Sequence, residues 1–252
     1  MRSFNKDLLK VNIYDTRDEM GRAAASDVKA AILALLEEKA EINMIFAAAP
    51  SQNDVLKELV SDKDIKWEKI NAFHMDEYIG LEKCAPQRFS NFLTEKIFSK
   101  VNFKSVNLID ATSKNVEEEI YRYSNLLKEF PPHIVVLGIG ENGHIAFNDP
   151  GFADFNDKKL VKEVTLDEKC RQQQVNDGCF DCLDKVPKTA LTLTVSALVS
   201  AKYLFCVVPT TLKAQAVYDT VCGEVTENCP ASILRTKDGA ILYLDSESAK
   251  LL

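Results

Sequence analysis

Residues 135–151 read VVLGIGENGHIAFNDPG. The run 133–137, which opens this stretch, is short and apolar, as is typical of a buried strand, and it leads directly into a glycine-rich turn. Glycine lets a backbone turn sharply and brings its N–H groups close to a ligand, because no side chain intervenes. We therefore expect a ligand to contact this turn at its three glycines, Gly138, Gly140 and Gly143.

The same turn carries a histidine, His144, and an acid follows it at Asp149. A histidine beside a carboxylate can move protons near neutral pH, because the carboxylate holds the ring in place. The pair is therefore a candidate for proton transfer. A tight loop with a solvent-facing histidine is the structural alternative, since short motifs also occur without function.

Apolar runs of strand length alternate with segments of helical period along nearly the whole chain. This alternation predicts an α/β fold of three layers, with a mainly parallel, open, Rossmann-like sheet and helices on both faces, in one domain spanning 1–252. Strands are expected at 9–14, 43–47, 66–73, 106–109, 133–137, 160–164, 190–195, 203–208 and 240–244. Helices are expected at 16–39, 51–60, 87–98, 116–128, 166–174 and 211–221.

Ligands of such sheets bind beyond the carboxyl ends of the strands. Four expected strands end just before segments with unusual residues, at Ala47, Phe73, Leu137 and Val208. We therefore expect the site to be built from the segments that follow these four residues.

Composition restricts the classes of partner. The 252 residues carry 31 basic and 38 acidic side chains, a net charge of −7, without a basic block. Binding to nucleic acid or to a membrane surface is therefore not expected. The first ten residues lack the apolar stretch of a signal peptide, and no run reaches the length of a membrane span, so a cytoplasmic protein is expected.

The cysteines suggest reduced thiols. Seven is an odd number, and they are scattered through a chain without an export signal. Cys179 and Cys182 form a C-x-x-C pair, but no second pair or suitably spaced histidine completes a zinc set. We expect no metal site and no redox cofactor.

A second segment, residues 71–81, reads NAFHMDEYIGL. Together with the GHIAFNDPG string it resembles the glucosamine-6-phosphate deaminase family, also called glucosamine-6-phosphate isomerase, over nearly the whole chain. The resemblance implies an enzyme that opens the ring of an amino-hexose 6-phosphate, moves a proton from C2 to C1, and releases ammonia to leave the ketohexose phosphate. It implies neither a metal nor a redox cofactor.

The resemblance also implies catalytic roles. Asp76, in the MDEY string, corresponds to the base that moves the proton between C2 and C1, and His144 corresponds to the ring-opening histidine. Basicity raised by a partly dry cleft suits Asp76 to this work. The structural alternative is a carboxylate that only caps the turn after its strand.

Both acidic neighbours of the family histidine differ in this chain. Asn142 stands where many members have aspartate, and Asp149 stands where they have glutamate. Asn142 can accept a hydrogen bond from the ring and fix its tautomer, but it cannot stabilise an imidazolium with a full charge. We therefore expect ring opening to be retained with an altered pH dependence.

The phosphate end departs further from the family. The usual TGxTP-like loop is replaced by residues 48–52, AAPSQ, in which a proline removes one N–H. Ser51, two residues after Ala49, could hold an anion at a helix N-terminus or could be only an N-cap. Lys213 matches the family's phosphate-binding lysine, although lysine often opens a surface helix. The family's ANxRFF-like string is absent, and Arg171 is the nearest arginine.

These departures leave alternatives to glucosamine 6-phosphate. Galactosamine 6-phosphate is a second possible substrate, and 6-phosphogluconolactonase shares the fold. The HIAFNDPG and MDEY strings favour the isomerase, because a lactonase needs no C2 base. A sugar-phosphate sensor would bind without turnover and would not need both Asp76 and His144. The chain stops soon after its last expected strand, so a monomer or homodimer is expected.

Overall fold

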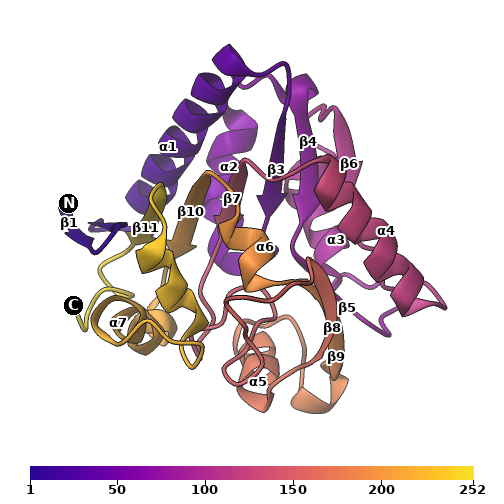
Figure 1. The fold of residues 1–252 in the computed structure, drawn as a ribbon. Coiled ribbons are helices and arrows are strands. Elements are labelled where there is room, and N and C mark those ends of the chain that lie inside the picture. The colour runs from indigo at the N-terminus through magenta and orange to yellow at the C-terminus, as the bar shows by residue number, and fades with distance from the viewer.

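The computed structural model describes residues 1–252. Eight strands form one sheet in the order β1-β2-β11-β10-β7-β3-β4-β6, shown in Figure 1, and three form a smaller sheet in the order β5-β9-β8. In the large sheet every neighbouring pair is parallel except β1 with β2. The strands are β1 (Arg2–Lys6), β2 (Leu9–Ile13), β3 (Ile42–Phe46), β4 (Ile70–His74), β5 (Asp76–Tyr78), β6 (Ser105–Asn107), β7 (Ile134–Leu137), β8 (Val161–Thr165), β9 (Thr189–Leu193), β10 (Tyr203–Val208) and β11 (Ala240–Leu244).

Helices cover both faces of the large sheet. They are α1 (Arg17–Glu38), α2 (Asn53–Ser61), α3 (Phe89–Leu93), α4 (Val116–Glu129), α5 (Glu168–Asn176), α6 (Val195–Val199) and α7 (Ala214–Cys222). Side chains of α1, α2 and α3 join one buried cluster, and those of α4, α6 and α7 join the cluster on the opposite face. The predicted three-layer α/β architecture is confirmed.

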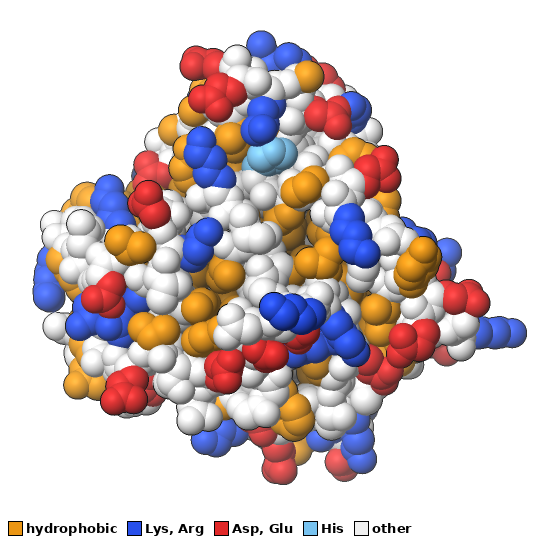
Figure 2. Space-filling model, in the orientation of Figure 1, with side chains coloured by type: hydrophobic (Ala, Val, Ile, Leu, Met, Phe, Trp, Pro, Cys, Tyr) orange, Lys and Arg blue, Asp and Glu red, His pale blue; other side chains and the backbone are white.

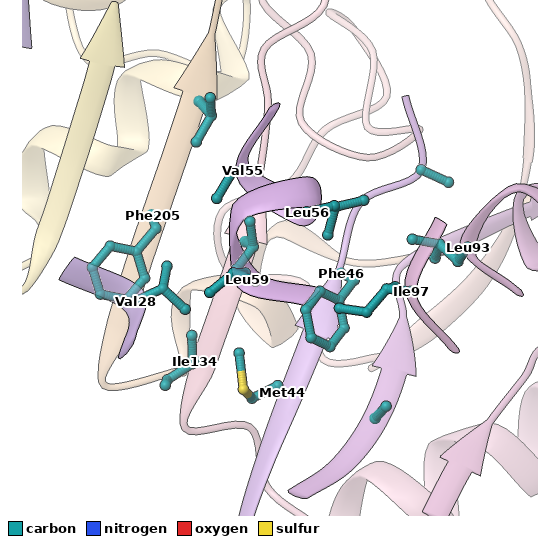
Figure 3. Close-up of a cluster of buried hydrophobic side chains, with 14 of the residues drawn as sticks. Val28, Met44, Phe46, Val55, Leu56, Leu59, Leu93, Ile97, Ile134 and Phe205 are labelled. Atoms are coloured by element: carbon teal, nitrogen blue, oxygen red, sulfur yellow. The ribbon is translucent and has the colours of Figure 1, made fainter. Parts of the chain in front are cut away.

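The two clusters follow from the pleat of the strands, because successive side chains point to opposite faces. In β3, Met44 and Phe46 pack under α1 and α2, whereas Ile45 packs on the other face. Figure 3 shows Phe46 beside Leu56 and Ile97, and Val28 of α1 near Phe205. All five β3 residues are buried, as expected for a central strand covered on both sides.

The chain order places a switch point at the centre of the sheet. From β3 the chain proceeds outward to β4 and β6, and it then returns to β7 and proceeds the other way to β10 and β11. Crossovers on the two sides of β3 and β7 therefore run in opposite directions, which leaves a crevice beyond their carboxyl ends. The ligand position expected from the sequence coincides with this crevice.

Four expected elements differ in the structure. The segments 160–164 and 190–195 do not extend the parallel sheet, because β8 and β9 pair antiparallel with each other. The strand expected at 66–73 begins later, because residues Trp67–Lys69 form a short 3-10 helix before β4. The helix expected at 87–98 is α3 followed by a π-helical turn at Thr94–Phe98.

The first two long helices begin differently. Thr16 caps α1, and its hydroxyl accepts the N–H of Glu19 at 3.2 Å. Ser51 does not cap α2: it lies in the 3-10 turn Pro50–Gln52, and no side chain caps the helix. The interpretation of Ser51 as an N-cap is therefore wrong.

The surface shows mixed charge. On the face drawn in Figure 2, basic and acidic side chains are interspersed among white and orange atoms. None of the helices combines the length and the apolar character that crossing a bilayer requires.

Tyr123 of α4 ties together the strand ends that precede the crevice. Its buried hydroxyl accepts the N–H of His74 at 3.1 Å and lies 2.9 Å from the carbonyl of His74 and 3.1 Å from that of Asn107. The His74 ring is also fixed, because its Nε2 accepts the N–H of Ile109 at 2.8 Å. Burial lowers the pKa of His74 to about 4, so this ring stays neutral at physiological pH.

Replacing Tyr123→Phe removes this hydroxyl and leaves buried backbone groups without their partner. We expect the free energy of unfolding to fall by about 1–3 kcal/mol. Urea unfolding at neutral pH measures the change. The matched control is Tyr121→Phe in the same helix, where the side chain is 71% exposed and a change within about 0.5 kcal/mol is expected. Equal effects of the two variants would contradict this role of Tyr123.

Candidate active site

A cleft lies where the carboxyl ends of β3, β4, β7 and β10 meet. It encloses about 730 Å³ of empty space, including its open mouth, and the residues that directly follow each of these strands line it. The predicted site residues that line it are Ala49, Ser51, Asp76, Gly138, Gly140, His144 and Lys213.

The glycine-rich turn after β7 is shaped around a ring. A Cβ atom at Gly140 would lie 2.2–2.4 Å from atoms of the His144 imidazole, so only glycine fits there. Gly143 has a φ of +86°, which glycine adopts readily.

The N–H groups of this turn are used differently from our expectation. The N–H of Gly140 donates to the carbonyl of His144 at 2.9 Å, and that of Gly143 donates to the carbonyl of Gly140 at 3.0 Å. Both are therefore engaged inside the turn and do not point at a ligand. Gly143 also lies outside the cleft lining, so the expected ligand contacts of Gly140 and Gly143 through their N–H groups are not supported.

The ring of His144 is held at one nitrogen. Its Nδ1 lies 2.7 Å from Oδ1 of Asn142 and 3.1 Å from Oδ1 of Asp149. Two acceptors at Nδ1 require a proton there, so in the neutral ring Nε2 carries the free lone pair. His144 lines the cleft and is able to accept or return a proton at Nε2.

A second row of polar groups orients Asn142 and Asp149. The Nδ2 of Asn142 donates to Asp149 at 3.0 Å and to Asp167 at 3.2 Å, which fixes its Oδ1 toward His144. The other oxygen of Asp149 accepts the N–H of Asp167 at 3.1 Å. Burial acts to raise the pKa of Asp149, but its hydrogen bonds with His144, Asn142 and the Asp167 N–H outweigh burial and lower it. Asp149 is therefore ionised beside the ring.

Asp76 lies at the start of β5, opposite Thr192 of β9. The sequence placed it after a strand, and the structure places it in a second, short one. Its carboxyl group is buried yet lines the cleft. Burial, and then the nearby charge of Glu77, raise the pKa of Asp76 well above 3.8. It is thus the more basic carboxylate of the site.

The adjacent acid has a structural role that the sequence did not reveal. The Glu77 carboxylate accepts the N–H groups of Tyr78, Phe89 and Ser90 and the Ser90 hydroxyl, at 2.6–3.1 Å. Arg88 Nε lies 3.4 Å from the same group. Glu77 therefore fixes the start of α3 against β5.

Lys213 supplies a buried cation at the other end of the cleft. Only 4% of the residue is exposed, it lines the cleft, and its Nζ has no hydrogen-bond partner in the protein. Burial lowers the pKa of Lys213, while Asp177 and Glu141 act in the opposite direction. An unpartnered buried ammonium group is costly unless a ligand supplies an acceptor.

The loop after β3 faces Lys213 across the sheet end. Ala49, Pro50 and Ser51 line the cleft, and the Ser51 hydroxyl accepts Nε2 of Gln52 at 3.0 Å. The Gln52 amide also reaches the carbonyl of Val207 at 3.2 Å, which connects this loop to β10.

The arginine that lines the cleft is not the one expected from the sequence. Arg171 does not line the cleft, because its guanidinium donates to the carbonyls of Leu183 and Val186 at 2.7–3.3 Å. Arg171 therefore has a structural role, and the prediction that it binds substrate is not supported. Arg17, which the sequence analysis missed, does line the cleft. An isolated arginine in the first turn of a long helix carries no signal for such a position.

One group of potential metal ligands is present. Donor atoms of His144, Asp149 and Cys170 lie within 4.8 Å of one another. His144 Nδ1 and Asp149 already bond each other and Asn142. Burial, with Asp149 nearby, raises the pKa of the Cys170 thiol, which opposes the thiolate that a metal needs. The arrangement suits a hydrogen-bonded network. Cys179 and Cys182 are free thiols.

The raised pKa of Asp76 predicts a cost in stability that grows with pH. Because the folded pKa exceeds the unfolded value, the folded state binds more protons, and stability falls as pH rises above about 4. Asp76→Asn removes this dependence. Urea unfolding at pH 5 and pH 8 is expected to show the variant gaining stability relative to the wild type at the higher pH. A constant difference would show that Asp76 ionises normally.

Comparison with known proteins places this geometry in a family. The family model described as glucosamine-6-phosphate isomerases/6-phosphogluconolactonase matches residues 15–243. A glucosamine-6-phosphate deaminase of Listeria monocytogenes is 34% identical over 212 residues, covering 84% of this chain and 88% of the relative. One from Lactobacillus delbrueckii is 30% identical over 244 residues, covering 97% and 100%.

Solved structures share the fold. A monomeric glucosamine-6-phosphate deaminase superposes with a TM-score of 0.86 at 28% identity, covering 96% of this chain and 99% of that one. The 6-phosphogluconolactonase of Thermotoga maritima superposes at 0.75 with 20% identity, covering 94% and 100%, and its likeness concerns the fold alone. The chain belongs to the glucosamine-6-phosphate isomerase/6-phosphogluconolactonase family.

Proposed function

We propose that this protein is an amino-sugar phosphate deaminase and isomerase, which converts glucosamine 6-phosphate to the ketohexose 6-phosphate and ammonia. The observation that carries the proposal is the shared cleft of Asp76 and His144, which come from distant parts of the chain. Deaminase relatives at 30–34% identity support the same activity. A cleft with a carboxylate base, a proton-transferring imidazole and a buried cation matches the needs of this reaction.

The first step is opening of the sugar ring. With Nδ1 protonated toward Asn142 and Asp149, Nε2 of His144 takes the proton of the C1 hydroxyl. The bond between C1 and the ring oxygen breaks, and the imidazolium returns the proton to that oxygen. Asp149 stabilises the intermediate charge, while Asn142 contributes only a hydrogen bond.

The second step transfers a proton between carbons. The Asp76 carboxylate removes the proton from C2 of the open aldehyde, the electrons move onto the carbonyl oxygen, and that oxygen takes up a proton. Asp76 then delivers its proton to C1, which gives a ketimine at C2. Water adds to the ketimine and ammonia leaves. The dry setting of Asp76 raises its basicity, as proton abstraction next to a carbonyl requires.

Lys213 and Ser51 are proposed to bind the 6-phosphate. The unpartnered Nζ of Lys213 suits an anion, and Ser51 places a hydroxyl in the same cleft. Ala49 and Gly138 line the wall between them and are proposed to contact the substrate by shape.

Lactonase activity is the second candidate within the family. The lactonase structures match below 25% identity and therefore concern the fold only. A buried base such as Asp76 favours the isomerase, because lactone hydrolysis abstracts no proton from carbon.

We further propose a monomer, as described for the 28% identical deaminase. The galactosamine 6-phosphate and sensor alternatives are separated by the assay below, and a cytoplasmic location stays a prediction.

Ammonia release from glucosamine 6-phosphate and galactosamine 6-phosphate tests the proposal. The wild type is expected to release ammonia, with glucosamine 6-phosphate preferred. Asp76→Asn and His144→Gln are each expected to lower kcat by about 10²–10⁴-fold, the usual contribution of a general acid or base. The control is His133→Gln, just before the start of β7 and away from the cleft, whose ring accepts a hydrogen bond from the Asn43 N–H.

Two outcomes would contradict the proposal. Faster hydrolysis of 6-phosphogluconolactone than deamination would favour the lactonase. Binding of glucosamine 6-phosphate without ammonia release would favour the sensor. The kcat of Asp76→Asn and of His144→Gln is measured on protein that retains the circular dichroism spectrum of the wild type, which shows that the variants fold.

Asn142→Asp tests the electrostatics around His144. A second carboxylate near Nδ1 stabilises the imidazolium, so the acidic limb of the kcat profile is expected to move to higher pH. The measurement is the pH dependence of ammonia release between pH 5 and pH 9. Asn156→Asp, on an exposed loop, is the control and is expected to leave the profile unchanged. A profile without any ionisation from His144 or Asp149 would contradict the ring-opening role.

A further inference from the structure

We propose that Arg17 is a substrate-binding residue, which supplies the second cation of the phosphate subsite beside Lys213. This inference rests on the proposed function. It assigns the recognition of the 6-phosphate to a residue from the first helix, far in sequence from the loops after β3 and β10.

Without Arg17, Lys213 is the one cation proposed for the phosphate subsite. A phosphate monoester carries a charge of about −1.5 to −2 near neutral pH. The buried Nζ of Lys213 provides one cation, Pro50 has no N–H, and Arg171 donates to carbonyls elsewhere. A single lysine therefore faces a dianion, and another positive group in the same cleft is needed to balance it.

Arg17 is held in position by the loop that it would assist. Its Nε donates to Oδ2 of Asp54 at 2.5 Å, and its Nη2 donates to the carbonyl of Pro50 at 2.7 Å. Nη1 makes no hydrogen bond within the protein, and the side chain remains 36% exposed at the cleft wall. A guanidinium has five N–H donors, so its free edge is available to phosphate oxygens.

The packing of α1 against α2 explains this placement. A Cβ atom at Gly21 would lie 2.6 Å from Cβ of Asp54, so glycine is required for the two helices to approach this closely. Gly21 follows Arg17 by four residues and therefore lies on the same face of α1. The close contact brings Asp54 under the guanidinium, which orients Arg17 toward Pro50 and the cleft.

An ordinary surface ion pair does not account for these contacts. Arg22 and Asp18 form such a pair on the same helix, with side chains 63% and 59% exposed and no part in the cleft. Arg17 instead bonds a carboxylate and a loop carbonyl at the cleft wall. The unpartnered Nζ of Lys213, which lines the same cleft, independently indicates an anionic ligand.

Three variants separate charge from structure. Arg17→Lys keeps the charge, Arg17→Gln keeps an amide donor for the Pro50 carbonyl without charge, and Arg17→Ala removes both. Arg22→Ala is the matched control on the same helix. Calorimetry with fructose 6-phosphate measures affinity independently of catalysis, and the KM for glucosamine 6-phosphate is measured beside it.

We expect Arg17→Ala and Arg17→Gln to weaken fructose 6-phosphate binding by about 10–100-fold, the range for loss of a charged hydrogen bond. KM rises by a similar factor, kcat changes less, and Arg17→Lys retains most of the affinity. Arg22→Ala leaves both unchanged.

Folded variants that keep wild-type affinity would overturn the inference, as would Arg17→Gln binding better than Arg17→Lys. If the wild type binds fructose 6-phosphate in an Arg17-dependent way but releases no ammonia, the proposed function fails while the assignment of Arg17 stands.

Discussion

The pairing of β7 between β10 and β3 is the constraint on which the rest of the structure depends. This register sets where the strand ends, and the turn that follows can then hold His144 so close to Gly140 that no Cβ atom would fit between them. Neighbouring strands end at the same edge and deliver Asp76 from one side and Lys213 from the other. A parallel sheet thus brings functional side chains from four segments, which lie far apart in the sequence, into one crevice.

Two groups in the crevice are poorly accommodated by the protein alone. Asp76 is a carboxylate in a dry environment, and Lys213 is an ammonium without an acceptor. The dry surroundings disfavour the charged form of both side chains. A bound sugar phosphate would offset this cost, because it offers a proton to Asp76 and an anion to Lys213. Aromatic packing maintains the dryness, since Tyr78 contacts the rings of Phe89 and Phe147 beside Asp76.

Sequence reasoning succeeded where local pattern determines structure. Strand length, helical period and the glycine-rich turn predicted the layers, the position of the cleft and the pairing of His144 with Asp149. The family resemblance implied the contact of His144 with Asn142. It failed where long-range packing decides. The pairing of β8 with β9, apart from the main sheet, has no signature in either strand. The orientation of the Arg171 side chain depends on its hydrogen bond to the Leu183 carbonyl. The orientation of the Arg17 side chain depends on the close approach of α2 to Gly21.

Asp76 and Glu77 are chemically similar neighbours with unrelated tasks, and the pleat of β5 is what separates them. Asp76 faces the cleft, while the Glu77 carboxylate accepts hydrogen bonds from the N–H groups at the start of α3. Loss of one residue between β4 and β5 would rotate the pair by half a turn, presenting the longer acid to the sugar and leaving the helix start without its acceptor. The short connection through the buried Met75 is therefore intolerant of length change.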